Sequence, residues 1–385
     1  MDALDRYAAA VAALNPVNLT RRDFLQGLLG AAVLAPSTLI ATPDTKPSLR
    51  SLAEAKGICF GSEIGLENID DPHVVRLIEH ECSMVVPGNE FKMTAILPDG
   101  GGAADFSDGD RIVDFAKAHG KLLRGHNLIW MTDEVAQPWL LSHDFGPRPR
   151  VAAEAFIRDY IHEVTQHFGP MVTSWDVINE AVDVGTGELR NCVFTRILGR
   201  DAVRIAFEAA HESMPKAQLF YNDYMDWRAD REPHRQGVLK LLRWLQEQRT
   251  PVHALGVQSH IKTSQTQFDP DRWNVFLNDV AAMDLSMAIT EFDVNDQLVS
   301  GTVEERDRQV AQIAKLYLDQ MLSFKEVKTF LLWGICDKYS YLQDVRKRAD
   351  GKPVRPNPYD DRYHRKPLRE TIALALIQTN KRKSP

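Results

Sequence analysis

Two stretches of the chain carry acidic side chains that are placed to do chemistry. Residues 172–181 read VTSWDVINEA and contain Glu180 at their end, and residues 285–294 read LSMAITEFDV and contain Glu291 and Asp293. Short apolar runs of this kind are typical of buried strands. Two carboxyl groups held near one another can act as a proton donor and a nucleophile. We therefore expect two parallel strands whose tips place Glu180 and Glu291 on opposite sides of the bond that is broken.

Eight short apolar runs recur along the chain and are separated by segments with helical periodicity. The runs begin near Ile58, Met84, Leu122, Val172, Leu219, Leu255, Met287 and Phe330. Apolar positions three and four residues apart predict helices around residues 156–168 and 310–321. Further crossover helices are expected at residues 110–119, 201–213, 233–248, 271–283 and 367–377. Alternating strands and helices imply parallel strands joined by right-handed crossovers.

Polar side chains gather directly after the apolar runs. They include Asn89, Lys92, His126, Asn179, Asn222, Gln258, His260, Asp293 and Trp333. In a closed barrel the carboxyl ends of all strands meet at one mouth, whereas the edge strands of an open sheet stay apart. An open doubly wound sheet would give a similar alternation, but no glycine-rich nucleotide loop follows the first run. We predict an α/β fold, a single-domain TIM (β/α)8 barrel with its site at that mouth.

Six motifs at the ends of these runs carry a family resemblance. In order they are GHNLIW at 125–130, WDVINEA at 175–181, YNDY at 221–224, GVQSH at 256–260, ITEFDV at 289–294 and LWGICD at 332–337. With these motifs the sequence resembles glycoside hydrolase family 10, the β-1,4-xylanases, over residues 57–378. The resemblance implies a retaining endo-1,4-β-xylanase that hydrolyses internal bonds of xylan through a covalent glycosyl-enzyme intermediate.

The resemblance also implies a role for each catalytic residue. Glu180 is expected to be the acid/base and Glu291 the nucleophile, and retaining glycosidases hold two such groups about 5–5.5 Å apart. Their pKa values must differ, and an ionised Glu291 would keep Glu180 protonated. His260, oriented by Asp293, is the expected hydrogen-bond donor to Glu291. Asn179 is expected to contact the sugar 2-hydroxyl, where hydrogen bonds strengthen in the transition state.

Further residues are expected to bind the sugar chain. Asn89, Lys92 and His126 resemble hydroxyl-binding residues of the family on the non-reducing side, and Gln258 is expected to support them. Trp333 would form the floor of the pocket and Trp130 one wall, because flat aromatic faces suit sugar rings. The full set of expected substrate-binding residues is Asn89, Lys92, His126, Trp130, Asn222, Tyr224, Gln258, Trp333 and Tyr341.

Four positions depart from the family pattern. Gly88 stands where the family usually has a glutamate, and Met93 where an aromatic residue usually closes the same motif. Asp133 stands at a position that is often glutamine, and Tyr341 replaces a late tryptophan. We expect all four to contact sugars away from the reacting bond. Loss of the carboxylate at position 88 predicts a preference for decorated or short xylan-derived chains over plain linear xylan.

Composition limits the other classes of function. The net charge is −7 and no long basic run is present, so nucleic acid is not expected as a partner. Four cysteines without a C-x-x-C pair predict buried thiols, although a single bridge stays open in an oxidising compartment. We expect no cofactor and no metal. Two alternatives remain, namely a retaining barrel hydrolase for another β-linked glycan such as β-glucan, and a non-catalytic sugar-binding protein.

The first part of the chain resembles an export signal. Residues 20–25 read TRRDFL and precede an uncharged run at 27–35 that is too short to span a bilayer as a helix. We expect residues 1–42 to form a twin-arginine-type signal region, so that the mature protein is periplasmic or secreted. Residues 43–56 are expected to be a connector, 57–378 the catalytic domain and 379–385 a disordered tail. We expect a monomer without a membrane anchor.

Overall fold

The computed structural model describes residues 46–98, 103–263 and 268–382. The expected signal region at 1–42 lies outside these residues. From Pro47 onward the described residues belong to one compact unit. Among them no helix combines the length and apolarity that a membrane span requires.

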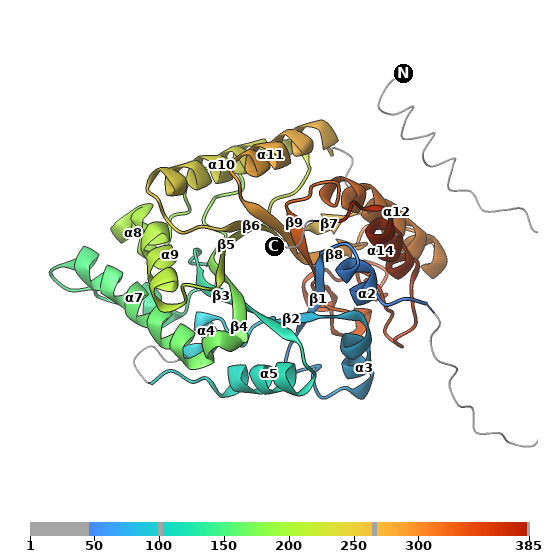
Figure 1. Ribbon diagram of the computed structural model, residues 1–385, viewed down its shortest axis with the longest axis horizontal. Helices are drawn as coiled ribbons and strands as arrows, with labels where there is room; N and C mark the ends of the chain where they lie inside the picture. Colours follow the sequence, from blue (N-terminus) through green and yellow to red (C-terminus); the bar gives the residue numbers. More distant parts are fainter. Residues whose placement is uncertain (1–45, 99–102, 264–267, 383–385) are drawn as a thin grey trace, which may run out of the picture. The chain divides into compact units, whose positions relative to one another are not determined.

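Eight parallel strands form a closed barrel, as the sequence predicted (Figure 1). The barrel strands are β1 (Cys59–Ile64), β2 (Met84–Pro87), β3 (Leu122–Trp130), β4 (Val172–Asn179), β5 (Gln218–Asp223), β6 (Ala254–Val257), β8 (Ser286–Asn295) and β9 (Val327–Leu332). Each pairs with its neighbour in this order, and the β1–β9 and β6–β8 pairings complete the ring. The short strand β7 (His260–Lys262) follows β6 and pairs with the last part of β8. Parallel closure brings the carboxyl ends of all strands to one mouth.

Helices surround the barrel in the view of Figure 1. The longer ones are α3 (Pro72–Glu81), α5 (Ser107–Ala118), α7 (Pro149–Phe168), α9 (Asp201–Ser213), α10 (Glu232–Glu247), α11 (Pro270–Ala282), α12 (Val303–Met321) and α14 (Pro367–Gln378). Shorter ones are α2 (Leu49–Glu54), α4 (Met93–Ile96), α6 (Pro138–Leu141), α8 (Val193–Leu198) and α13 (Leu342–Val345). All seven predicted helices are present, with ends that differ from the prediction by a few residues, except that the long helices α7 and α12 begin about seven residues earlier than their apolar patterns.

Local sequence explains where several helices begin. Thr302 caps α12 by accepting a hydrogen bond from the Glu305 amide, and the Glu305 side chain accepts one from the Thr302 amide. This reciprocal pair satisfies two backbone donors that the helix leaves open. Five of the longer helices have proline in their first turn, where the missing N–H costs no helical hydrogen bond.

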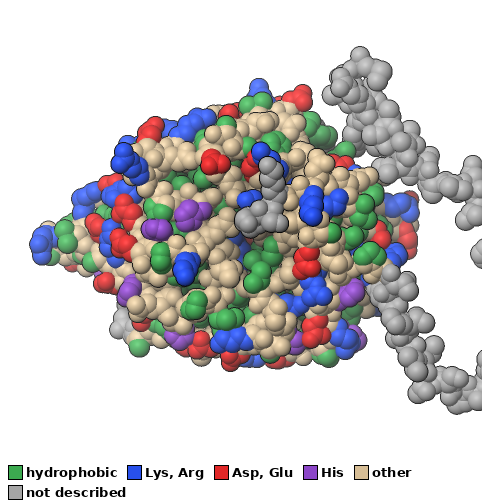
Figure 2. Space-filling view, viewed as in Figure 1, with side chains coloured by type: hydrophobic (Ala, Val, Ile, Leu, Met, Phe, Trp, Pro, Cys, Tyr) green, Lys and Arg blue, Asp and Glu red, His purple; other side chains and the backbone are tan. Residues whose placement is uncertain are grey.

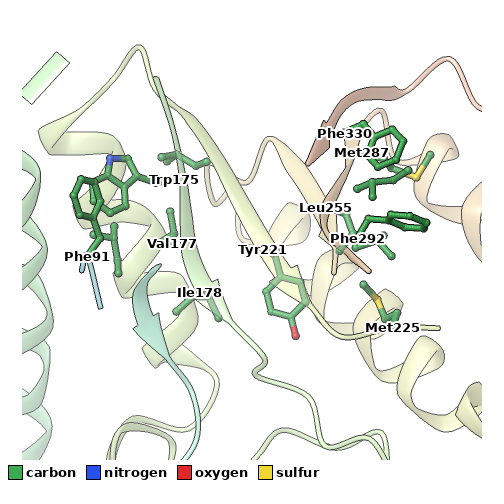
Figure 3. Close-up of a cluster of buried hydrophobic side chains, with 14 of the residues drawn as sticks. Phe91, Trp175, Val177, Ile178, Tyr221, Met225, Leu255, Met287, Phe292 and Phe330 are labelled. Carbon is green, nitrogen blue, oxygen red and sulfur yellow. The ribbon is translucent and has the colours of Figure 1, made fainter. Parts of the chain in front are cut away.

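Large aromatic side chains fill the apolar core (Figure 3). Trp175 on β4 is fully buried and stacks on Phe91 with ring centroids 5.6 Å apart. Gly125 on β3 lies against this indole, and a Cβ atom at position 125 would be 2.2 Å from the ring. The glycine that opens the GHNLIW motif is therefore required by packing rather than by turn geometry.

The two ends of the described unit differ from the expected connector and tail. Within residues 43–56, Leu49 and Ala53 of α2 are fully buried. The buried Glu81 carboxylate of α3 joins α2 to α14, because it accepts hydrogen bonds from the Leu49 amide and from Arg369. Arg382, in the expected tail, is 3% exposed and donates to the carbonyls of residues 322, 324 and 327. Buried polar groups need such partners, which order both segments.

The surface in view carries charges of both signs. Figure 2 shows Lys and Arg side chains interspersed with Asp and Glu side chains over the same face as Figure 1. This face therefore has no extended patch of a single sign. All four cysteines are free thiols, so the disulfide that the sequence left open is not formed.

Candidate active site

The carboxyl ends of the strands surround an open cleft of about 420 Å³, within the range of ligand-binding pockets. Twelve of the fourteen side chains predicted for the site line it: Asn89, Lys92, His126, Trp130, Asn179, Glu180, Tyr224, Gln258, His260, Glu291, Trp333 and Tyr341. The cleft is also lined by Glu63, Glu67, Gly88, Arg190, Tyr339 and Arg346. The other two predicted residues, Asn222 and Asp293, lie behind this lining.

Glu291 lies on β8 and is held by several donors. Its Oε2 atom is 3.1 Å from His260 Nε2, and its Oε1 atom accepts a hydrogen bond of 2.8 Å from Asn222 Nδ2. His126 Nδ1 is 3.9 Å from Oε1. Burial opposes the charge, but His126, His260 and Asn222 outweigh it and lower the pKa of Glu291 to about 2. Glu291 is therefore an ionised carboxylate with fixed orientation.

Asp293, on the paired strand, orients His260. His260 on β7 pairs in register with Asp293 on β8, and His260 Nδ1 is 2.8 Å from Asp293 Oδ2. Burial disfavours the imidazolium, but Asp293 and Glu291 raise the pKa of His260 to about 10. With one ring nitrogen bound to Asp293, the other donates to Glu291. The contacts that the resemblance implied for His260 and Asp293 are present.

Glu180 follows β4 directly and has a backbone φ of +56°, which non-glycine residues rarely adopt. Its amide donates to the Asn222 carbonyl at 2.9 Å, and its Oε1 atom accepts from Gln258 Nε2 at 2.8 Å. Arg190 Nη2 is 3.8 Å from Oε2. Burial, and then the charges of Asp223 and Glu291, raise the pKa of Glu180 above its ordinary value.

Side-chain amides connect the two glutamates. Asn179 Oδ1 accepts hydrogen bonds from Asn222 Nδ2 at 3.0 Å and Gln258 Nε2 at 3.3 Å. The same two amides also donate to Glu291 and Glu180, so one network of hydrogen bonds joins the two glutamates. Asn179 Nδ2 donates to no described residue, which leaves it available to a ligand in the cleft.

Asn222 corrects one prediction. We expected it to bind substrate, but it is fully buried. Its amide donates to Asn179 and Glu291, and its Oδ1 atom accepts from Thr290 Oγ1 at 2.7 Å. With donor and acceptor both used inside the protein, Asn222 positions Glu291 and does not contact the sugar.

Aromatic rings and a lysine surround the glutamates. The Trp333 ring lies edge-on to His126 and His260, with centroids 5.2 Å and 6.3 Å away. Lys92 Nζ lies 5.0 Å from the centroid of the Trp130 ring and donates to Asn89 Oδ1 at 3.0 Å. These faces and donors match the chemistry of a sugar, which has apolar ring faces and hydroxyl edges.

Two of the four departures from the family pattern lie outside the cleft. Asp133 was expected to contact a sugar, but its carboxylate accepts from the Val193 amide at 2.9 Å and pairs with Arg196. It therefore binds the first amide of α8 and does not face the cleft. Met93 was expected in the same role, but it packs partly buried against the core beside the cleft. Gly88 and Tyr341 do line the cleft.

Sequence reasoning missed five residues of the cleft, namely Glu63, Glu67, Arg190, Tyr339 and Arg346. Arg190 and Arg346 lie in loops and Tyr339 ends the short 3-10 helix Asp337–Tyr339, and no periodic pattern points to a binding role there. Glu63 was detectable, because it is the charged member of the apolar run CFGSEI. Among the described residues no group of three or more His, Cys, Asp and Glu side chains is arranged to hold a metal ion.

The opposite pKa shifts predict a bell-shaped pH profile for kcat/KM. Activity should fall on the acid side as Glu291 gains a proton, near its pKa of about 2. It should fall on the alkaline side as Glu180 loses its proton, above the ordinary pKa of a glutamate. Initial rates after a brief shift to each pH, with recovery at neutral pH as the control for unfolding, measure both limbs. An acid limb above the ordinary glutamate pKa would contradict the assignment of Glu291 as the pre-ionised group.

Comparison with known proteins gives a consistent family. The sequence model described as glycosyl hydrolase family 10 matches residues 48–375. A β-1,4-xylanase of Dictyoglomus thermophilum is 29% identical over 78% of this chain and 85% of its own length. Endo-1,4-β-xylanase A of Humicola insolens is 30% identical over 70% of this chain and 69% of its own.

Solved structures agree with the sequence comparisons. Native xylanase 10B of Thermotoga maritima is 28% identical with a TM-score of 0.76, over 86% of this chain and 98% of that one. Xylanase 10B of Thermotoga petrophila, solved in complex with xylobiose, is 27% identical with a TM-score of 0.77, again over 86% and 98%.

Proposed function

We propose that this chain, which belongs to glycosyl hydrolase family 10, is an endo-1,4-β-xylanase that retains the anomeric configuration. The relatives named above are xylanases, and one of the similar structures holds xylobiose. The observation that carries the mechanism is the pair of glutamates in one cleft, Glu291 with its pKa lowered and Glu180 with its pKa raised. One nucleophilic carboxylate and one proton donor are what double displacement requires.

In the first step a Glu291 oxygen attacks the anomeric carbon of the xylose unit. The bond from this carbon to the glycosidic oxygen breaks, and Glu180 gives its proton to that oxygen, so the leaving chain departs as an alcohol. Asn179 Nδ2, which donates to no described residue, then donates to the 2-hydroxyl of the reacting sugar, where the interaction strengthens as charge develops.

In the second step water replaces Glu291. Esterification removes the negative charge of Glu291, which was one of the causes that raised the pKa of Glu180. The ionised Glu180 then takes a proton from a water molecule, whose oxygen attacks the anomeric carbon and releases Glu291 as a carboxylate. Two inversions at one carbon leave the product in the β configuration.

Product analysis tests the substrate. We expect linear xylohexaose to be cut at internal bonds, with β-xylobiose, β-xylotriose and β-xylotetraose as the first products by NMR and chromatography. Mixed-linkage β-glucan and arabino- or glucuronoxylan fragments, assayed in parallel, decide between xylan, another β-glycan and decorated chains. The double variant Glu180→Gln/Glu291→Gln is the control for contaminating activity. Hydrolysis of β-glucan without hydrolysis of xylohexaose would overturn the proposal.

We infer that the enzyme acts outside the cytoplasm. The support is the sequence TRRDFL at 20–25 followed by a short uncharged run. Expression of the full chain in a bacterium with a twin-arginine export system should place activity in the periplasm or medium. The variant Arg21→Lys/Arg22→Lys should retain it in the cytoplasm, and equal export of the two would count against the signal.

A further inference from the structure

In the cleft the side chain of Glu63 lies directly against Gly88. Gly88 follows β2 directly and precedes Asn89. A Cβ atom at position 88 would lie 2.5 Å from Glu63 Oε1 and 3.3 Å from Glu63 Cδ. The carboxylate of Glu63, which comes from the neighbouring strand β1, therefore occupies the space into which a side chain at position 88 would extend. A larger residue at 88 and the present position of Glu63 exclude each other.

The Glu63 carboxylate lacks a donor inside the protein. Among the described residues no hydrogen bond or ion pair to it is found, although it is partly buried. Burial, and then the charges of Glu67 and Glu90, raise the pKa of Glu63 well above its ordinary value. The nearby Glu90 differs, because it accepts from the amides of Leu66 at 2.9 Å and Asn89 at 3.1 Å. A group that is partly removed from water without a partner is costly unless a ligand supplies one.

Glu63 is placed one step away from the reacting centre. Lys92 and Glu63 line the same cleft as Glu291. Lys92 Nζ donates to Asn89 Oδ1 at 3.0 Å, and Asn89 directly follows Gly88, against which Glu63 lies. A sugar chain that passes from Glu291 along Lys92 and Asn89 would therefore bring its next unit to Glu63.

We propose that Glu63 binds the hydroxyl groups of the sugar unit that precedes the reacting xylose on its non-reducing side. This rests on the proposed xylanase function. A carboxylate has two oxygens that can accept from two adjacent hydroxyls of one ring. Strand β1 thus supplies a carboxylate at the place where Gly88 on β2 leaves room for it. The expected weakness towards plain linear xylan, which was argued from Gly88, is then compensated by Glu63.

Two aryl glycosides separate this contact from catalysis. p-Nitrophenyl β-xyloside fills only the reacting position, whereas p-nitrophenyl β-xylobioside adds the unit that would reach Glu63. Glu63→Ala is expected to lower kcat/KM on the xylobioside by about 10- to 100-fold, the size of hydrogen bonds to a charged group. Activity on the xyloside should stay near the wild-type value, which also shows that the variant is folded. Glu63→Gln keeps the shape of the side chain, and its kcat/KM on the xylobioside should lie between those of the wild type and Glu63→Ala.

A second experiment moves the carboxyl group from position 63 on β1 to position 88 after β2. In Glu63→Ala/Gly88→Glu the space vacated on β1 accepts the new side chain, and the xylobioside activity should recover in part. Gly88→Glu alone, with Glu63 still present, should lose activity because both carboxylates need one space. A ratio of xylobioside to xyloside kcat/KM that is unchanged in Glu63→Ala would overturn the inference while the xylanase function stands. A wild-type protein that is inactive on both glycosides and on xylohexaose would overturn the proposed function itself.

Discussion

Replacing Glu291 by alanine is expected to lower kcat on xylohexaose by about 10⁴-fold or more, the size that removal of a nucleophile has in other enzymes. Glu291 is ionised and held by His260 and Asn222, whereas the pKa values of Glu63, Glu67 and Glu180 in the same cleft are raised. Added azide should restore part of the turnover on an activated aryl xylobioside. The product should be the α-xylobiosyl azide, because a single displacement inverts the anomeric carbon.

The controls for this variant lie on the same molecule. Glu163→Ala changes an exposed glutamate on α7 and should leave kcat unaltered. Glu291→Ala should bind xylo-oligosaccharides and give the circular dichroism spectrum of the wild type. Recovery of a β-azide would contradict the nucleophile assignment, as would turnover within about tenfold of the wild type, a difference of only about 1.4 kcal/mol in barrier.

Replacing Glu180 by alanine is expected to affect substrates according to their leaving groups. On xylohexaose, where the departing sugar alcohol needs a proton, kcat/KM should fall by about 10²- to 10⁴-fold. On 2,4-dinitrophenyl β-xylobioside the first step needs no protonation and should be nearly unaffected. Turnover of that substrate should then be limited by the second step, in which Glu180 acts as a base. A rapid first release of dinitrophenol followed by a slow phase would show this in stopped-flow measurements.

The neighbour of Glu180 provides a matched comparison. Arg190→Ala removes a cation 3.8 Å from the Glu180 carboxylate without removing the acid. It should reduce xylohexaose activity less than Glu180→Ala and should move the alkaline limb of the pH profile to higher pH, since a cation favours the ionised carboxyl group. Equal losses on xylohexaose and on the dinitrophenyl substrate in Glu180→Ala would rule out the acid role.

The parts of the structure that depend on local pattern could be predicted from the sequence. Strands buried on both faces leave continuous apolar runs, and the amphipathic helices that cover them leave apolar positions three and four residues apart. Closure followed from the polar residues after each run. The carboxyl ends of β4 and β8 are separated by β5 and β6 in the ring, and only a closed barrel brings Glu180 and Glu291 into one cleft.

The roles of individual polar residues depend on packing that the local pattern does not contain. Asn179 is the last residue of β4 and Asn222 the last but one of β5, yet Asn222 is enclosed by Asn179, Thr290 and Glu291. Asp133 follows Trp130 closely in sequence, but its side chain binds the first amide of α8. In both cases a neighbour distant in sequence determines which way the side chain faces.

The effect of Gly88 on sugar binding also could not be predicted from this position alone. The missing carboxylate at this position was taken as a loss of sugar affinity, because the alternative source of the charge lies on another strand. Glu63 and Gly88 are 25 residues apart in the printed numbering, and only the parallel pairing of β1 with β2 brings them together. The close approach of Glu63 to Gly88 is therefore known only from the fold.

The central claim is that Glu291 forms a covalent bond with the sugar. The most direct measurement is mass spectrometry of the enzyme after incubation with 2,4-dinitrophenyl 2-deoxy-2-fluoro-β-xylobioside, whose fluorine slows both steps and whose leaving group favours the first. We predict one added fluoroxylobiosyl group per chain, located by proteolysis and fragmentation on Glu291. An adduct on another residue, or rapid release of dinitrophenol with an α-configured product and no adduct, would contradict the account.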